Sequence, residues 1–389
     1  MPDLQHHLHI YPSPFKNESR ILKETQTLIE RGLADQILIL SAWQAGLSTQ
    51  ERIDEQRSVQ RLQTFWDRLP PSKPVKLLRY VAFILLAYGR FSRVPFDYVN
   101  CHSLNVLLIG VWLKKWGKTK QVIYDTHELE TERAGLGGLA QQVSRWLEKK
   151  LMPAVDEVIT VCEPISQWYK ATYQLPEVFT IPNAPTHPRP GELYPRSRIL
   201  RETFGIPSEA IIFIYQGILS EARGIGPVLE VFKDTALDKH LVLMGFGPME
   251  QEAKDAAKSY ANIHFQEAVP PDQILHYSSS ADVGLFFLPF EQISLSYHLS
   301  LPNKFFEYSI AGLYLIISDN LVEQARWVQT EKLGSVLPST KAALRDFVQQ
   351  LDRPMIQEQL KASEHFRKHV GWQQSEAVYE QIYAGSIKK

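Results

Sequence analysis

A lysine and a glutamate three residues apart carry the clearest chemical signal in the sequence. Residues 300–312 predict a short loop and a helix that begins at Pro302 and ends at Gly312. The N–H groups and partial positive charge of a helix start favour a phosphate, and Lys304 adds a full charge there. Glu307 lies about one turn, roughly 5.4 Å, further along the same side and could hold a ribose diol. The spacing predicts a nucleoside-diphosphate site, with a solvated lysine–glutamate pair as the alternative.

An arginine in a second loop would add to such a site. Arg223 stands between an apolar strand at 211–215 and a predicted helix, where a guanidinium and helix N–H groups together favour a diphosphate. The nearby Gly-Ile-Gly at 224–226 lacks the third glycine of a dinucleotide fingerprint. The Gly-Phe-Gly-Pro turn at 245–248 lets a ligand approach the backbone closely. Taken alone, that turn is better explained as a tight strand–helix connection.

Two histidines follow predicted strands in the first half of the chain. His102 comes after the strand at 97–100, and His127 comes after the strand at 121–124. In doubly wound sheets, the loops after the carboxyl ends of strands line the ligand crevice. A histidine there can donate a hydrogen bond to a sugar hydroxyl or stabilise charge. A histidine that only fills a turn is the alternative for both, and we favour it for His102.

The elements that must position these residues alternate regularly along the chain. Short apolar strands alternate with helices, which is typical of doubly wound parallel α/β sheets. The pattern restarts after a proline-rich stretch at 181–191 that has no periodicity. We predict two Rossmann-like domains, residues 1–190 and 191–371, that face a central cleft. A C-terminal helix within 372–389 is expected to pack back toward the first domain.

Three stretches of the first half are less clearly patterned. Residues 44–72 are polar with a helical tendency. Residues 73–93 predict a helix that is apolar in the middle and basic at both ends. We favour a helix that covers the sheet, with contact to an anionic membrane surface as the alternative. In the loop at 11–20, Lys16, Ser19 and Arg20 could meet an anion, but solvated charges are the favoured interpretation.

Composition excludes some classes of protein. The formal net charge of -1 argues against a nucleic-acid-binding protein that relies on bulk charge. Two cysteines, Cys101 and Cys162, are too few for a disulfide framework or a zinc cluster, and we expect buried free thiols. The first residues lack the pattern of a secretory signal, and the most apolar run, at 80–88, is too short to span a bilayer. We therefore expect a cytoplasmic protein, with the inner face of the membrane as an optional site of contact.

Two doubly wound domains joined by a linker resemble the GT-B glycosyltransferase fold. Residues 300–319 resemble the signature of family-4 glycosyltransferases, in the subgroup where Pro-Asn-Lys precedes Phe-Glu-Tyr, as used in bacterial surface polysaccharide synthesis. Arg223-Gly224 is similar to the basic residue and glycine before the first helix of that family's donor domain. The turn at 245–248, Ala-Asp-Val at 281–283 and His127 also fit. The resemblance covers most of the chain and is loose before about residue 95.

This resemblance implies a retaining, hexosyl-type glycosyltransferase that needs no metal or other cofactor. The donor would be a nucleoside-diphosphate sugar, UDP- or GDP-linked, and the acceptor a glycan or a lipid-linked saccharide. Glu307 would bind the ribose, Arg223 and Lys304 the diphosphate, and His127 the transferred sugar; the implied catalytic residues are His127, Arg223 and Lys304. The implied donor-binding residues are Arg223, Gly245, Gly247, Ser300, Asn303, Lys304 and Glu307. The chain has no Asp-x-Asp motif, which agrees with metal independence.

Two positions depart from the family pattern. Many members carry a second glutamate eight residues before the ribose-binding one, where this chain has Leu299, and many carry arginine where this chain has Ile218. The residues that could substitute are Glu291, Gln292 and Ser300. Without a substitute, activity is weak or absent. These departures motivate the alternative of a GT-B-like scaffold or partner protein without catalysis. A sugar-nucleotide epimerase of the same fold is a further alternative.

Overall fold

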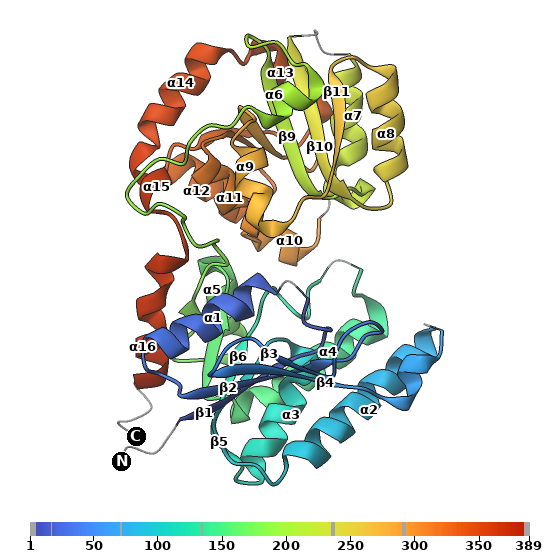
Figure 1. Cartoon of the computed structure of the whole chain (residues 1–389), viewed down its shortest axis with the longest axis vertical. Coiled ribbons are helices and arrows are strands. Elements are labelled where there is room, and N and C mark those ends of the chain that lie inside the picture. The colour runs from blue at the N-terminus through green and yellow to red at the C-terminus, as the bar shows by residue number, and fades with distance from the viewer. Residues whose placement is uncertain are drawn as a thin grey trace. The chain divides into compact units, whose positions relative to one another are not determined.

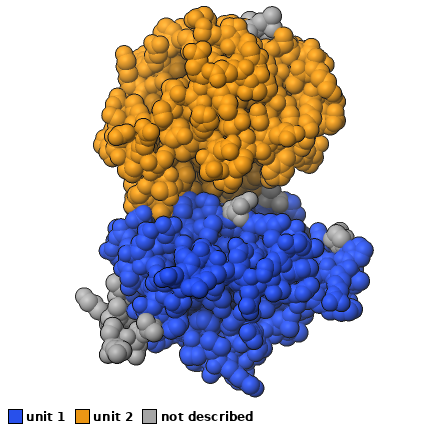
Figure 2. All heavy atoms as spheres, viewed as in Figure 1, with its two compact units in different colours: residues 1–182, 375–389 blue, residues 183–374 orange. Residues whose placement is uncertain are grey.

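The chain folds into two compact units. The computed structural model describes residues 5–16, 18–70, 72–133, 135–234, 238–289 and 293–384. Unit 1 comprises residues 1–182 and 375–389, and unit 2 comprises residues 183–374 (Figure 2). Each unit is built on one sheet with helices on its faces, which confirms the prediction of two doubly wound α/β domains. The boundaries predicted from the sequence follow residues 190 and 371, and the two units divide after residues 182 and 374.

Unit 1 contains an eight-stranded sheet. Its strands are β1 (His6–Tyr11), β2 (Gln36–Ala42), β3 (Gln50–Arg52), β4 (Arg57–Leu62), β5 (Phe96–Cys101), β6 (Thr119–Asp125), β7 (Glu157–Thr160) and β8 (Phe179–Thr180). Its α-helices are α1 (Ser19–Glu30), α2 (Lys73–Phe91), α3 (Leu104–Lys115), α4 (Gly138–Leu151), α5 (Glu163–Tyr173) and α16 (Glu376–Ala384). The strand order is β3-β4-β2-β1-β5-β6-β7-β8. The order reverses between β1 and β5, so the carboxyl ends of these strands flank the crevice where such sheets bind ligands.

The prediction of a helical tendency for residues 44–72 is wrong. This stretch holds β3 and β4, which pair antiparallel at the edge of the sheet. Every residue of β3 is exposed, so it carries no apolar pattern. In β4, Val59 and Arg61 are buried and their neighbours are less so, which is the two-residue period of a strand. From its sequence alone, an exposed edge strand therefore cannot be distinguished from polar chain without a preferred structure.

Helix α2 covers the sheet with one side only. Phe83, Ile84 and Ala87 are buried, as expected for a covering helix. Leu77 and Leu85, by contrast, are 62% and 59% exposed. In the part of the chain that the structure describes, none of the helices has the length and apolar character needed to cross a membrane.

Helix α16 returns to unit 1 and lies beside α1, on the face of the sheet opposite α2 and α3 (Figure 1). Arg31, at the end of α1, pairs with Glu376 at 3.1 Å and also with Glu380. Tyr379 and Tyr383, both residues of α16, are buried. Cys101 and Cys162 are both buried and free, as predicted.

Unit 2 contains a six-stranded, fully parallel sheet. Its strands are β9 (Ile211–Ile218), β10 (Lys239–Phe246), β11 (Ile263–Glu267), β12 (Val283–Phe286), β13 (Tyr314–Ser318) and β14 (Gly334–Leu337). Its α-helices are α6 (Ile199–Phe204), α7 (Ile225–Lys233), α8 (Glu250–Ser259), α9 (Ile274–Ser278), α10 (Leu295–Leu299), α11 (Asn303–Ala311), α12 (Val322–Thr330), α13 (Lys341–Gln350), α14 (Arg353–Ala362) and α15 (Glu364–His369). The order β11-β10-β9-β12-β13-β14 reverses between β9 and β12. A ligand crevice is expected at the carboxyl ends of these strands.

Candidate functional site

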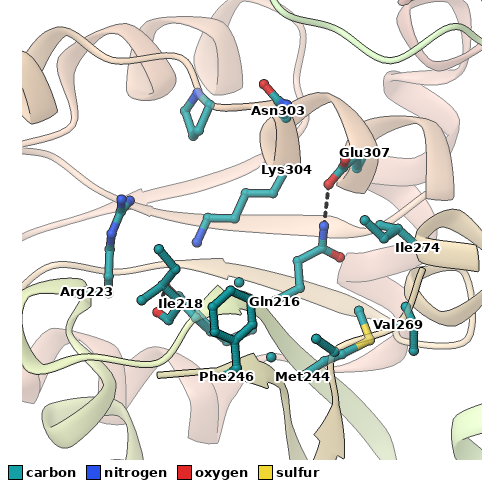
Figure 3. A pocket seen from close by; sticks show the side chains of 15 residues that line it. Gln216, Ile218, Arg223, Met244, Phe246, Val269, Ile274, Asn303, Lys304 and Glu307 are labelled. Atoms are coloured by element: carbon teal, nitrogen blue, oxygen red, sulfur yellow. Dashed lines mark hydrogen bonds between the residues drawn. The ribbon is translucent and has the colours of Figure 1, made fainter. Parts of the chain in front are cut away.

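A pocket of about 500 Å³ opens at the carboxyl edge of the unit 2 sheet (Figure 3). Its walls come from the ends of β9 and β10, the residues after β11, the start of α9 and the first turns of α11. The residues that line it are Tyr215, Gln216, Gly217, Ile218, Arg223, Met244, Gly245, Phe246, Ala268, Val269, Ile274, Pro302, Asn303, Lys304 and Glu307. The structure thus brings together five of the donor-binding residues that the resemblance implies, namely Arg223, Gly245, Asn303, Lys304 and Glu307.

The start of α11 forms one wall of this pocket. Pro302 is the residue before the first helical turn, one position earlier than predicted, and its side chain makes no capping hydrogen bond. Gly312 ends the helix in the left-handed conformation, with a φ of +80°. Asn303 and Lys304 therefore stand in a first turn whose N–H groups lack an intrahelical acceptor. This wall suits an anionic ligand.

Two cations extend into the pocket from different elements (Figure 3). The Lys304 amine lies 3.9 Å from the centre of the Tyr215 ring and 4.7 Å from that of Phe286. The Arg223 guanidinium lies 4.6 Å from the Tyr297 ring centre. Burial and the charge of Arg223 lower the pKa of Lys304 to about 7. A lysine amine held against aromatic rings disfavours the alternative of a solvated lysine–glutamate pair.

Glu307 is oriented by Gln216, a residue that no motif in the sequence identifies. Its carboxylate accepts a hydrogen bond from the side-chain amide of Gln216 (dashed in Figure 3). The Ser278 hydroxyl donates to the amide oxygen of Gln216 at 2.6 Å, which fixes the direction of the amide. Gln216 is a polar residue that follows the apolar run 211–215, and this position is the signal that could have identified it.

The backbone around the pocket requires glycine for reasons of packing. Gly224 has a φ of +75°, and a Cβ there would lie 2.3 Å from the carbonyl oxygen of Phe287. A Cβ on Gly245 would lie 1.9 Å from the carbonyl oxygen of Gly217. At both positions the missing side chain lets two backbone segments approach each other closely. These glycines therefore shape the pocket whether or not they touch a ligand.

Two of the donor-binding residues implied by the resemblance lie outside the lining of this pocket. Gly247 follows the end of β10 and packs against the backbone of Leu219. Ser300 lines a smaller hollow of about 30 Å³ that shares Arg223 and Lys304 with the pocket. The Ser300 hydroxyl donates to the carbonyl oxygen of Tyr297 at 3.0 Å.

The two departures from the family pattern fall in different places. Ile218 lines the pocket and is 48% exposed, so an apolar side chain stands at the position where the resemblance implies arginine. Leu299, the last residue of α10, is absent from the lining. Of the residues proposed as substitutes, Glu291 and Gln292 lie outside the described part of the chain.

His127 lies in unit 1, just after the carboxyl end of β6. Its side chain is 26% exposed, and Nε2 lies 3.3 Å from Oδ2 of Asp125. The ring of Tyr11 stacks on it with the centroids 6.1 Å apart. His102 is fully buried, with Nδ1 3.1 Å from the same oxygen of Asp125. The structure therefore gathers both histidines on one carboxylate.

The favoured interpretation of Arg20 as a solvated charge is wrong. Arg20 is only 3% exposed, and its guanidinium binds both oxygens of Asp125 at 2.7 and 2.9 Å. A buried carboxylate needs such a partner, and the first turn of α1 supplies it. Burial alone would raise the pKa of Asp125, but the charge of Arg20 and the hydrogen bonds hold it well below its usual range.

Comparison with solved structures defines the class of fold. Sucrose-phosphate synthase from Thermosynechococcus elongatus matches with a TM-score of 0.76 and 14% identity over 99% of both chains. HepE from Anabaena, solved with UDP and glucose, matches with a TM-score of 0.68 and 12% identity over 98% of this chain and 100% of its own. WaaG, a glycosyltransferase of lipopolysaccharide biosynthesis, matches with a TM-score of 0.65 and 15% identity over 96% of this chain and 99% of its own. The chain therefore has the GT-B fold of these glycosyltransferase structures.

Sequence comparison narrows the class. The profile described as Glycosyltransferase Family 4 matches residues 26–184, which is less than half of the 389-residue chain. None of the curated proteins that were compared matches the sequence. Together, the family match in the first half and the fold of the whole chain support a glycosyltransferase of the family-4 type.

Proposed function

We propose that this protein transfers a sugar from a nucleoside-diphosphate sugar to a glycan or lipid-linked acceptor, with retention of configuration and without a metal. One observation carries the proposal: Arg223, Lys304 and Glu307 line a single pocket at the carboxyl edge of a doubly wound sheet. Arg223 and Lys304 would hold the diphosphate. Glu307, about one turn of α11 beyond Lys304, would accept hydrogen bonds from the ribose diol.

The apolar wall of the pocket supports the same orientation of the nucleotide. Met244, Val269 and Ile274 line its side near Glu307 and Gln216 (Figure 3). A flat heterocyclic base is largely apolar on its faces, and such a wall would shelter it. The base, ribose and diphosphate would then occupy successive parts of the pocket, ending at Arg223.

The two cations would also supply the transfer chemistry. The bond between the anomeric carbon and the diphosphate oxygen breaks, and the acceptor hydroxyl oxygen bonds to that carbon on the same face while its proton passes to the leaving diphosphate. Negative charge grows on the diphosphate during this step, and Arg223 and Lys304 would stabilise it. Removing one such preorganised donor costs about 3–4 kcal/mol. His127 would contact the transferred sugar.

Calorimetric titration of the full chain with UDP and GDP tests the binding mode. We expect Glu307→Ala to abolish measurable binding of the preferred nucleotide, because the ribose loses its acceptor and Gln216 its partner. Glu252→Ala, an exposed glutamate on α8 in the same unit, should leave the affinity unchanged. An unchanged affinity of Glu307→Ala would remove Glu307 from the site.

Ile218 favours one competing function. Its apolar side chain stands in the pocket where many family members carry arginine, so a protein that binds a sugar nucleotide without transferring the sugar would also fit. Incubation with a panel of sugar nucleotides separates the cases: transfer or donor hydrolysis excludes the non-catalytic binder. Conversion of the donor without a change of mass would instead indicate an epimerase.

A contact with an anionic membrane forms the last part of the proposal. Leu77, Val81 and Leu85 are exposed at intervals of four residues along α2, and the helix contains no acidic residue. Trp116 is 64% exposed and lies next to Tyr88 of α2, with ring centroids 6.3 Å apart. An apolar stripe on a basic helix suits an anionic lipid surface and would bring unit 1 to a lipid-linked acceptor in polysaccharide synthesis.

Flotation with phosphatidylglycerol-containing vesicles tests this contact. We expect the wild-type chain to float with the anionic vesicles and to remain behind with purely zwitterionic ones. Replacing Leu77, Val81 and Leu85 with glutamine should abolish flotation, because the exposed apolar stripe is lost. Absence of flotation by the wild-type chain would leave α2 only the role of a covering helix.

A further inference from the structure

A buried row of hydrogen-bonded side chains runs through unit 1 from α16 to the sheet. The Tyr383 hydroxyl donates to Oδ1 of Asn100 at 2.7 Å. Nδ2 of Asn100 lies 3.2 Å from Nε2 of His9, and Nδ1 of His9 lies 3.0 Å from Nε2 of His102. His9 and Asn100 face each other across the paired strands β1 and β5, which is why these groups meet.

The row ends on a carboxylate that is held ionised. Nδ1 of His102 lies 3.1 Å from Oδ2 of Asp125. Arg20 binds both oxygens of Asp125, so this carboxylate carries its charge inside the unit. An ionised carboxylate only accepts hydrogen bonds. Nδ1 of His102 must therefore carry the proton that this bond uses.

The buried imidazoles of His9 and His102 allow only one arrangement of their protons. Burial lowers the pKa of His102 to about 4 and that of His9 well below its usual range, so both rings are neutral at pH 7. A neutral imidazole has one donor and one acceptor nitrogen. Since His102 donates through Nδ1, its Nε2 accepts from His9, and Nε2 of His9 accepts from Asn100. Every hydrogen bond then points from α16 toward Asp125.

His127 has two possible acceptors for a proton on Nε2. Oδ2 of Asp125 lies 3.3 Å from this nitrogen, and Nδ1 of His102 lies 3.4 Å from it. Because Nδ1 of His102 already carries a proton, only Asp125 can accept. Among the described residues, none of the hydrogen bonds of His127 uses Nδ1.

We propose that this row fixes His127 as the Nε2–H tautomer, which makes Asp125 and His102 positioning residues for His127. In this tautomer, Nδ1 of His127 offers its lone pair to a ligand hydroxyl. The consequence for sugar transfer rests on the proposed function, whereas the tautomer does not.

The other groups around His127 do not change this assignment. Tyr11 faces the ring from β1, and burial raises its pKa to about 12, so it stays neutral. The carboxyl oxygen Oε2 of Glu24, on α1, lies 3.9 Å from Nδ1 of His102. Burial and the charge of Asp125 raise the pKa of Glu24 well above its usual range, so Glu24 is protonated and uncharged. The ionised groups at the cluster are Arg20 and Asp125.

Nitrogen-15 NMR of the histidine-labelled full chain tests the proposal without any substrate. Each ring is assigned by its own His→Gln variant. At pH 7 we expect neutral Nδ1–H tautomers for His9 and His102, and we expect the proton of the neutral His127 ring on Nε2. An Nε2–H tautomer or a charged ring at His102 would overturn the proposal.

Two substitutions then shift the Nε2–H proton resonance of His127 in opposite directions. Asp125→Asn removes the charged acceptor and should move this resonance upfield, because the hydrogen bond weakens. His102→Leu removes a competing donor from Asp125 and should move the resonance downfield, and it keeps the pair between Arg20 and Asp125. Should Asp125→Asn fail to fold, His102→Leu therefore still gives a result.

His7→Leu is the matched control for loosened packing. His7 is buried on the same strand as His9 and stacks on the rings of Tyr383 and His9, but neither of its ring nitrogens takes part in the hydrogen bonds of the row. Its replacement should leave the Nε2–H resonance and the tautomer of His127 unchanged. Equal shifts in His7→Leu and His102→Leu would contradict a positioning role. Because the NMR samples contain no nucleotide, failure of nucleotide binding would count against the proposed function alone.

Discussion

The pocket of unit 2 and the histidine cluster of unit 1 are built in different ways. In unit 2, Lys304 and Glu307 come from one short helix, and Arg223 precedes another helix by two residues. In unit 1, residues from α1, β1, β5, β6 and α16 converge, and Asn100 and Tyr383 are 283 positions apart. A site carried by one helix can be recognised from residue types and spacing. A site assembled from distant segments shows itself only through its contacts.

The largest effect is expected from a substitution that removes the counter-charge of the unit 1 cluster. Replacing Arg20 with methionine leaves Asp125 buried without its counter-charge, which should lower the free energy of unfolding by about 3–5 kcal/mol. Urea unfolding followed by circular dichroism measures the change. Arg31→Met, at the end of the same helix, removes partly exposed pairs with Glu376 and Glu380 and should cost about 1 kcal/mol or less. Equal losses in the two variants would show that Arg20 is not an essential counter-charge.

The next effect concerns the cation at the start of α11. Lys304→Ala should reduce sugar transfer by about 3–4 kcal/mol, roughly 10²- to 10³-fold, because a fixed positive charge facing the diphosphate is lost. Turnover with the preferred sugar nucleotide is the measurement. Lys254→Ala is the matched control, since Lys254 also lies over an aromatic ring in unit 2, 5.0 Å from the centre of Phe265. A comparable loss in the control would point to the fold rather than to the site.

A smaller effect is expected at the residue that orients Glu307. Gln216→Leu removes the hydrogen bond to the carboxylate and should weaken nucleotide binding by about 1.5–3 kcal/mol. Calorimetry with the matching diphosphate would show this change. Gln216→Glu sets a like charge beside Glu307 and should be at least as damaging. Wild-type affinity in both variants would mean that Gln216 does not act on the ribose.

The smallest effect is a pH dependence confined to unit 2. In the free protein the pKa of Lys304 is about 7, and a bound diphosphate would raise it by adding negative charge. Its contribution to binding is therefore complete below pH 7 and declines above it, by at most about tenfold per pH unit. Affinities measured between pH 7.5 and 9.5 would reveal this decline. Lys304→Arg should flatten the profile, because a guanidinium stays protonated.

The fold and much of the unit 2 pocket could be predicted from the sequence. Strands alternate with helices, and α11 carries its opening proline, its charges and its closing glycine within one segment. Gln216 and Ser278 escaped prediction because they meet across 62 positions and neither carries a motif.

Unit 1 was harder to predict for the same physical reason. From the sequence alone, Arg20 is interpreted as a solvated loop charge, because its partner Asp125 lies 105 positions away. His102 reads as a turn residue because its hydrogen bonds come from other strands. The stretch that forms β3 and β4 has the composition of a polar loop because the edge strand β3 buries nothing. For Arg20 and His102, a long-range contact decided what local composition could not.

A crystal structure of the full chain with its preferred nucleoside diphosphate would show directly whether the unit 2 pocket binds the nucleotide. We expect the diphosphate to contact Arg223 and Lys304 and both ribose hydroxyls to lie within hydrogen-bonding distance of the Glu307 carboxylate. A nucleotide bound outside the unit 2 pocket, or one whose ribose points toward Arg223, would contradict this binding mode.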